Sequence, residues 1–151
     1  AQIGGALKNI YAIAAGIAEG LNLGENAKSA LISRSFAEMT RYAKNFKADK
    51  NTLFGLSGLG DLILTCSSKN SRNTQFGIKL ASSKYDNFLD LLKSQEVTEG
   101  YYTVKAVYNI SQKKNIDMPI MESVYNILYK RHVLKEEISN LLNRPQTDEK
   151  I

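Results

Sequence analysis

Residues 5–20 read GALKNIYAIAAGIAEG, and the larger apolar residues recur every three or four positions. This spacing places them on one face of an α-helix that is expected to end near Gly20 or Gly24. The face is made of Leu7, Ile10, Ile13, Ala14 and Ile17. The many alanines and glycines of the stretch permit the close approach of a neighbouring helix or a ligand.

The same helical periodicity dominates the rest of the chain. Further helices are predicted to begin near Asn26, Asp49, Asn70 or Ser71, Asp86, Thr98 and Pro119, and the last to carry Leu134, Ile138, Leu141 and Leu142. The apolar run Leu62–Cys66 follows a glycine-rich segment, 55–61, that reads as a tight turn. We expect the run to be helical because no partner strand is visible elsewhere. The sequence therefore predicts one all-α domain over residues 1–151, with about eight helices.

Composition excludes several classes of protein. With 43% hydrophobic and 23% charged residues in 151 positions, the chain is a typical globular domain. No run approaches the roughly 18 apolar residues of a membrane span. The single Cys66 forms no internal disulfide and belongs to no metal-type cluster, so we expect a buried thiol, no metal and a cytoplasmic location.

The net charge of +5 comes from basic residues spread among acidic ones. A protein that binds nucleic acid more often concentrates its basic residues on one face, so no nucleic-acid partner is expected. A basic surface also attracts an anionic metabolite.

Lys8 is the first candidate for chemistry. It lies between apolar Leu7 and Ile10, and its helix face continues through Ala12 and Ala15 without a nearby carboxylate in the sequence. A lysine desolvated on such a face loses proton affinity and can exchange a proton near neutral pH. The alternative is a surface lysine whose methylene stem covers small residues.

Ser71, Arg72 and Asn73 present a hydroxyl, a guanidinium and a carboxamide in consecutive positions. Arginine matches a phosphate group with two parallel N–H donors, and a helix start adds backbone N–H groups. The segment therefore predicts a site for a small phosphorylated alcohol or ketone. The alternative is a helix cap followed by a solvated arginine.

Asp61 follows Gly58-Leu59-Gly60 and has two interpretations. It is either a helix N-cap or a group that accepts a hydrogen bond from a substrate hydroxyl or orients Lys8. The glycines themselves make no dinucleotide fingerprint, because Ile63 occupies the third glycine position and no strand precedes them.

Several segments occur in an order that resembles one enzyme family. They are Gly-Ala-Leu-Lys-Asn at 5–9, Gly-Leu-Gly-Asp-Leu at 58–62, Thr65-Cys66, Ser71-Arg72-Asn73 with Phe76-Gly77, and Val97-Thr98-Glu99-Gly100. Together they closely resemble the C-terminal substrate-binding domain of bacterial NAD(P)-dependent sn-glycerol-3-phosphate dehydrogenase. The related 3-hydroxyacid and ketopantoate dehydrogenases have a Lys-x-x-x-Asn pairing, which this chain lacks because Ala12 follows Lys8 at that distance.

The resemblance implies a fold like that of the C-terminal domain of 6-phosphogluconate dehydrogenase. It also implies that Lys8 exchanges the proton of the C2 hydroxyl when sn-glycerol 3-phosphate and dihydroxyacetone phosphate are interconverted. Substrate contacts would come from Lys8, Asp61, Ser71, Arg72 and Asn73, with Thr65 as a weaker candidate. Contacts to the cofactor, NAD or NADP, would come from Arg72, Val97 and Glu99.

The family also has an N-terminal Rossmann domain that holds most of the NAD(P), and this chain begins at Ala1 without it. We therefore expect a fragment that folds but does not catalyse alone, from an enzyme that supplies glycerol 3-phosphate for phospholipid synthesis. Its partners would be the substrate, its own Rossmann domain and a second copy in a homodimer. The alternatives are a standalone helical module for phosphorylated ligands or nucleic acid, and the dimerisation domain of another dehydrogenase.

Overall fold

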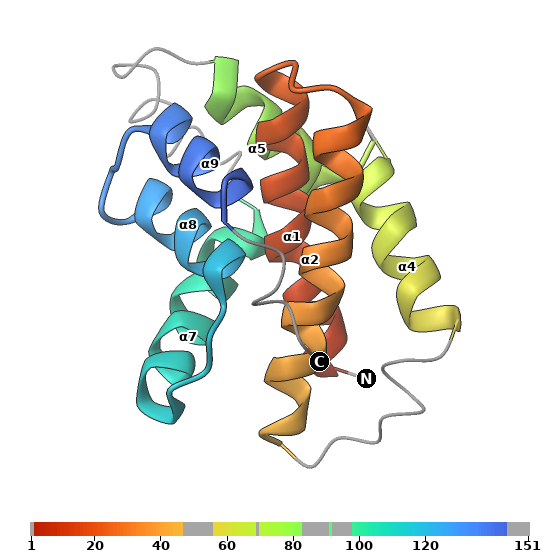
Figure 1. Cartoon of the computed structure of the whole chain (residues 1–151), viewed down its shortest axis with the longest axis vertical. Coiled ribbons are helices and arrows are strands. Elements are labelled where there is room, and N and C mark those ends of the chain that lie inside the picture. Colours follow the sequence, from red (N-terminus) through yellow and green to blue (C-terminus); the bar gives the residue numbers. More distant parts are fainter. Residues whose placement is uncertain (1, 47–55, 69, 83–90, 92–97, 145–151) are drawn as a thin grey trace.

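The computed structural model of the chain describes residues 2–46, 56–68, 70–82, 91 and 98–144. These residues form seven helices and no strand: α1 (Gln2–Gly20), α2 (Glu25–Lys44), α4 (Leu56–Ser67), α5 (Arg72–Ser82), α7 (Glu99–Lys114), α8 (Pro119–Leu128) and α9 (Leu134–Leu142). The predicted all-α fold is confirmed, and the number of helices is close to the prediction (Figure 1). The helix predicted from Asp49 lies outside the described residues, as does nearly all of the one predicted from Asp86.

Helix α1 lies at the centre of the molecule and contacts α2, α4, α5, α7 and α8 (Figure 1). Every residue from Ile10 to Ala18 is buried. This part of α1 is apolar or small on all sides, so neighbouring helices can cover it completely. The helix ends at Gly20, as the apolar spacing predicted.

The backbones of α1 and α5 almost touch at Gly16 and Gly77. A Cβ atom on Gly16 would lie 2.1 Å from the carbonyl oxygen of Thr74, and one on Gly77 would lie 2.2 Å from that of Ile13. No side chain fits at either position, so glycine sets the distance between the two helices. The small residues of α1 thus admit a close neighbouring helix, and that helix is α5.

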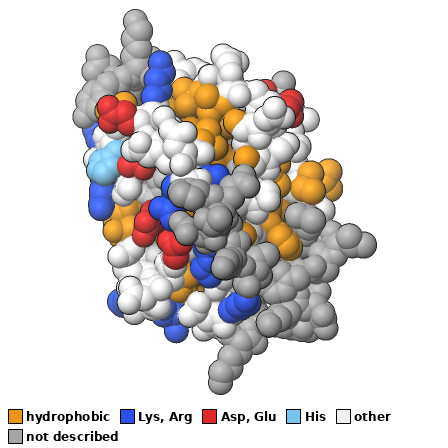
Figure 2. Space-filling view, viewed as in Figure 1, with side chains coloured by type: hydrophobic (Ala, Val, Ile, Leu, Met, Phe, Trp, Pro, Cys, Tyr) orange, Lys and Arg blue, Asp and Glu red, His pale blue; other side chains and the backbone are white. Residues whose placement is uncertain are grey.

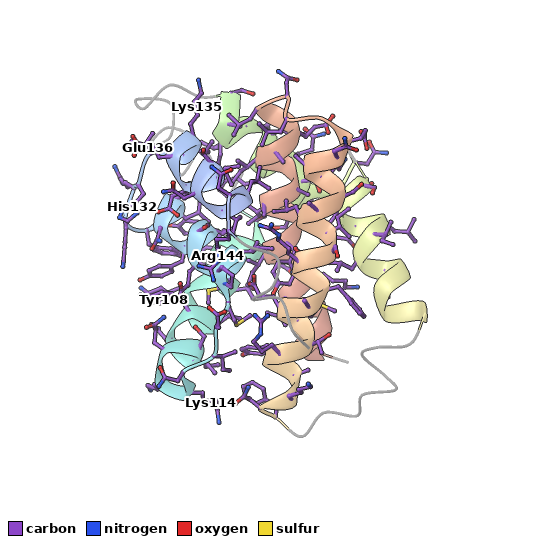
Figure 3. All side chains as sticks on the ribbon, viewed as in Figure 1. Tyr108, Lys114, His132, Lys135, Glu136 and Arg144 are labelled. Atoms are coloured by element: carbon purple, nitrogen blue, oxygen red, sulfur yellow. The ribbon has the colours of Figure 1, made fainter. Side chains whose placement is uncertain are left out.

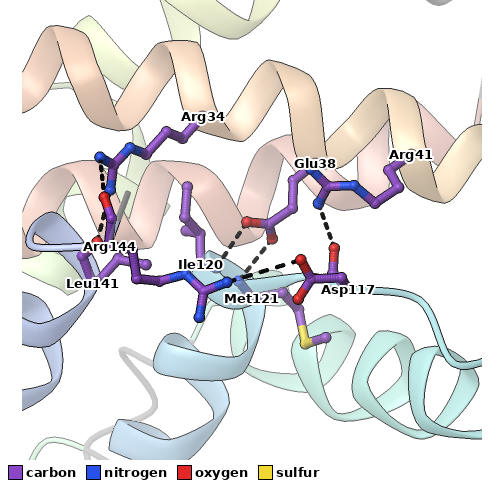
Figure 4. A network of polar contacts seen from close by, with 8 residues as sticks. All are labelled: Arg34, Glu38, Arg41, Asp117, Ile120, Met121, Leu141 and Arg144. Atoms are coloured by element: carbon purple, nitrogen blue, oxygen red, sulfur yellow. Dashed lines mark hydrogen bonds and ion pairs between the residues drawn. The ribbon is translucent and has the colours of Figure 1, made fainter. Parts of the chain in front are cut away.

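Buried Glu38 joins α2 to the start of α8 (Figure 4). Its Oε2 accepts a hydrogen bond from the Ile120 N–H at 2.8 Å, and its Oε1 accepts one from the Met121 N–H at 3.0 Å. The first N–H groups of a helix have no partner inside the helix, and the positive end of the helix dipole favours a carboxylate there. Glu38 also accepts a hydrogen bond from the Tyr11 hydroxyl, so α1, α2 and α8 meet at one side chain.

Arg34 makes the complementary contact at the end of α9. Its guanidinium donates to the carbonyl oxygens of Leu141, at 2.7 Å, and Arg144, at 3.0 Å (Figure 4). Leu141 lies in the last turn of α9, where the negative end of the helix dipole favours a cation. Helix α2 therefore holds the two C-terminal helices through opposite charges at opposite helix ends.

Two local predictions were wrong. Helix α4 already begins at Leu56, so Gly58-Leu59-Gly60-Asp61 is helical and not a tight turn. A glycine inside a helix costs about 1 kcal/mol, which the burial of Leu62 and Cys66 in the core offsets. Helix α2 has Gly24 at its N-cap position and not Asn26.

The charged side chains are mixed over the face seen in Figure 2, where Lys and Arg lie among Asp and Glu. No basic stripe crosses this face. In the described part of the chain, no helix is both long and apolar enough to cross a membrane.

Candidate active site

An ion pair joins α1 to α4 at the residues singled out by sequence. The Lys8 Nζ atom lies 3.7 Å from Asp61 Oδ2, and the two side chains are 27% and 62% exposed. Two predictions from the sequence are therefore wrong: that Lys8 has no nearby carboxylate, and that Asp61 is a helix N-cap. Lys8 does have a nearby carboxylate, because the packing of α4 on α1 brings Asp61 beside it, and Asp61 is no N-cap, because it lies inside α4. The interpretation that Asp61 orients Lys8 stays a prediction.

The starts of α5 and α7 are joined by Asn73 and Gly100. The Oδ1 atom of buried Asn73 accepts a hydrogen bond from the Gly100 N–H at 3.1 Å. Gly100 also packs on α1, since a Cβ atom there would lie 3.0 Å from the carbonyl oxygen of Asn9 and 2.6 Å from Ile13 Cδ1. The segments 5–9, 71–73 and 98–100 therefore meet in space, although they are far apart in the chain.

Thr74 joins the start of α5 to α4. Its hydroxyl donates to the Thr65 carbonyl oxygen at 3.2 Å, and its N–H donates to Ser71 Oγ at 3.4 Å. Ser71 is thus the N-cap of α5, which is the structural role that the sequence left open. Thr74 was not among the candidates selected from the sequence. Its only signal was its position three residues after Ser71.

Two exposed charged side chains flank the contact between Asn73 and Gly100. Arg72 is the first residue of α5 and Glu99 the first of α7, and each directly precedes one member of the contact. A cation and an anion therefore lie at the solvent edge of the same helix junction. Val97, the third residue predicted to contact the cofactor, lies outside the described residues.

Histidine and cysteine, the other residue types that often carry chemistry, lie away from this helix junction. His132 is in the turn between α8 and α9, 2.7 Å from Glu137, on the opposite side of the molecule from α4 (Figure 3). Cys66 is buried in the core, and this burial raises the pKa of its thiol to about 12, so it is a poor nucleophile at neutral pH. Within the ranges that the structure describes, no group of three or more His, Cys, Asp or Glu residues is arranged to hold a metal ion.

Comparison with known families agrees with this arrangement. Residues 1–139 match the model of the family described as NAD-dependent glycerol-3-phosphate dehydrogenase C-terminus. The chain belongs to this family. The resemblance seen in the sequence motifs is thereby confirmed.

Curated relatives extend the match over nearly the whole chain. The chain is 44% identical over 148 residues to glycerol-3-phosphate dehydrogenase [NAD(P)+] of Psychromonas ingrahamii, and 43% identical over 149 residues to that of Staphylococcus carnosus. Each alignment covers 98% of this chain and 44% of the relative. The chain thus spans less than half the length of these glycerol-3-phosphate dehydrogenases.

Solved structures of the family share the fold. The glycerol-3-phosphate dehydrogenase of Coxiella burnetii superposes with a TM-score of 0.85 and 39% identity, over 94% of this chain and 43% of the other. That of Saccharomyces cerevisiae gives a TM-score of 0.77 and 30% identity, over 93% of this chain and 41% of the other. The all-α arrangement is therefore the fold of the corresponding part of both glycerol-3-phosphate dehydrogenases.

Proposed function

We propose that this chain is the substrate-binding and catalytic half of an NAD(P)-dependent glycerol-3-phosphate dehydrogenase, which interconverts sn-glycerol 3-phosphate and dihydroxyacetone phosphate. The observation that carries the proposal is the Lys8–Asp61 ion pair, at 3.7 Å, on the helix where the other family motifs meet. A Rossmann domain would form the other wall of the site. We further propose a cytoplasmic enzyme that feeds phospholipid synthesis, and a homodimer as its assembly.

Lys8 is the group that moves the proton. NAD(P), when bound, accepts or returns the hydride at C2 of the substrate. In the oxidation of glycerol 3-phosphate, the proton of the C2 hydroxyl passes to Lys8 Nζ. In the reverse direction the ammonium stabilises the charge that develops on the C2 oxygen and then protonates it. Asp61 holds Nζ in place through the ion pair.

Arg72 and its neighbours bind the phosphate of the substrate. The guanidinium is exposed at the first residue of α5, where the N–H groups of the helix start also favour an anion. The Ser71 hydroxyl and the Asn73 carboxamide lie on either side of it in the chain. A bidentate arginine with two neutral donors is suited to a phosphate monoester.

The solvent edge of this junction also fits a dinucleotide. Arg72 and Glu99 are both exposed. They are the first residues of α5 and α7, and these two helix starts are in contact through Asn73 and Gly100. A guanidinium suits phosphate groups, and a carboxylate accepts hydrogen bonds from hydroxyl or amide groups. These two residues would hold the cofactor from this side, and Val97 is proposed as a third contact.

A fusion enzyme tests the proposal. In it, this chain replaces the matching part of the Psychromonas ingrahamii relative, and the oxidation of NADH and NADPH is followed with dihydroxyacetone phosphate. We expect the fusion to be active and Lys8→Ala to lower kcat by about 10²–10⁴-fold. Lys135→Ala, on α9 and far from α4 in Figure 3, is the control and should leave kcat unchanged.

Two outcomes would contradict the proposal. One is a folded fusion enzyme that is inactive under conditions in which the parent relative is active. The other is a Lys8→Ala fusion with full activity. The chain by itself is expected to fold and to show no turnover, because the other wall of the site is supplied by the remaining part of the fusion.

A further inference from the structure

The start of α7 is capped by a residue of another helix. Thr98 occupies the N-cap position but makes no side-chain cap hydrogen bond, and its hydroxyl is buried without a partner. An N-cap threonine usually accepts a hydrogen bond from the N–H of the second or third helical residue. Here the second residue is Gly100, and its N–H donates to Asn73 Oδ1 of α5 at 3.1 Å. Asn73 therefore replaces Thr98 as the cap.

This contact fixes which way the Asn73 carboxamide is turned. A backbone N–H can only donate, so the atom that faces Gly100 must be the carboxamide oxygen and not the nitrogen. The two N–H donors of Nδ2 are then left for another partner. Arg72 directly precedes Asn73 at the start of α5, so these donors belong to the segment proposed to bind the phosphate.

The junction leaves little space for independent movement of α7. A Cβ atom on Gly100 would lie 2.7 Å from Asn73 Oδ1 and 2.6 Å from Ile13 Cδ1, so this helix start is enclosed by α5 on one side and α1 on the other. Glu99, the first residue of α7, is carried by the same helix turn. Asn73 therefore contacts the helix turn that carries Glu99.

We propose that Asn73 is a positioning residue that couples the two sides of the site. Its oxygen holds the start of α7, which carries Glu99 on the cofactor side, and its nitrogen binds the phosphate-bearing substrate. The inference rests on the proposed function for the identity of the two ligands. Because coupling between two binding sites is reciprocal, the substrate and the cofactor should each favour binding of the other.

Hydrogen exchange of single backbone amides tests the cap in this chain without any ligand. We expect the Gly100 amide to exchange about tenfold faster in Asn73→Ala, which removes the acceptor. Asn73→Asp keeps an acceptor at the positive end of a helix dipole and should exchange like the wild type. The Met121 amide, capped by Glu38 in the same manner at α8, is the internal control and should not change.

Steady-state kinetics of the fusion enzyme test the coupling. Asn73→Ala should raise the KM for dihydroxyacetone phosphate about tenfold or more and the KM for NADH about fivefold. Ser71→Ala removes a proposed substrate contact and the N-cap hydrogen bond of α5 but leaves the acceptor for the Gly100 N–H in place, so it should raise the KM for dihydroxyacetone phosphate and not the KM for NADH. Asn73→Asp should restore the protection of the Gly100 amide but not the KM for dihydroxyacetone phosphate, since it lacks the donor.

Equal exchange of the Gly100 amide in wild type and Asn73→Ala would overturn the cap. An unchanged KM for NADH in Asn73→Ala would overturn the coupling, and an unchanged KM for dihydroxyacetone phosphate in Asn73→Asp would overturn the donor role. An inactive fusion enzyme would instead contradict the proposed function, while the exchange measurement would still decide whether Asn73 caps α7.

Discussion

The Lys8 ammonium and the Asp61 carboxylate lie 3.7 Å apart on two different helices of the core. The positions of α1 and α4 are set by buried residues such as Leu62, whereas the pair itself is accessible to solvent. An exposed ion pair contributes at most about 1 kcal/mol to folding stability. The pair is therefore of little consequence for the stability of the fold.

Asp61→Asn should separate the effect of the pair on stability from its effect on activity. We expect the free energy of unfolding to change by less than about 1 kcal/mol. The kcat of the fusion enzyme should fall about tenfold or more, because Lys8 Nζ loses the charge that positions it. Asp117→Asn is the matched control, since it removes a similarly exposed ion pair with Arg144 at 3.9 Å. If both variants lose activity equally, or neither does, Asp61 does not position Lys8.

Arg72→Ala should weaken the binding of glycerol 3-phosphate by about 10–100-fold, the usual effect of removing a charged hydrogen-bond partner. Arg72→Lys should recover only part of the affinity, because an ammonium cannot make the two parallel bonds of a guanidinium. Lys135→Ala also removes one positive charge, but far from the site, so it controls for the change in the net charge of the protein. Isothermal titration calorimetry of the fusion enzyme measures all three, and equal binding by wild type and Arg72→Ala would exclude Arg72 from the phosphate site.

Alanine substitutions at two helical glycines, Gly77 at the contact between α1 and α5 and Gly60 in α4, should have opposite effects on stability. In Gly77→Ala the new Cβ would lie 2.2 Å from the Ile13 carbonyl oxygen and 2.8 Å from Ile17 N, and both are backbone atoms that cannot move alone. The variant should lose about 2–4 kcal/mol of unfolding free energy. Gly60→Ala, also in a helix, meets nothing within 4 Å and should gain up to about 1 kcal/mol. Urea unfolding of both variants tests this, and similar midpoints would show that α5 can move away from α1.

The sequence predicted the helices well where apolar periodicity and burial agree. α1 and α9 were predicted from such stripes, and the start of α8 was predicted from Pro119. At α4 it correctly predicted that 62–66 is helical, but Gly58 and Gly60 wrongly indicated a turn before this run. The local preference of glycine there is weaker than the burial of Leu62 and Cys66 against the core.

The sequence offered a pairing of Asp61 with Lys8 as one interpretation, but the atomic contacts within the site could not be derived from it. The Lys8–Asp61 and Asn73–Gly100 contacts join segments that only helix packing brings together. The family motifs indicated that these residues share a site. They did not indicate which atoms meet, nor that Asn73 replaces Thr98 as the cap of α7.

The stability of the chain should fall as the pH rises above about 9. Burial raises the pKa of the Cys66 thiol from 9.0 to about 12, and burial together with Glu38 raises that of the Tyr11 hydroxyl well above 10.0. Between the unfolded and folded pKa values, the folded state binds more protons than the unfolded state. The free energy of unfolding therefore decreases with rising pH, by up to about 1.4 kcal/mol per pH unit for each such group, and this contribution is complete below pH 9.

Urea unfolding of wild type and Cys66→Ala at several pH values between about 7 and 11 measures the contribution of the thiol. The variant retains the effect of Tyr11 but loses that of Cys66, so its stability should decline less steeply above pH 9. Parallel curves for the two proteins would mean that the thiol ionises equally in both states. That result would contradict the burial of Cys66, since the cost of desolvating a thiolate is what raises the pKa in the folded protein.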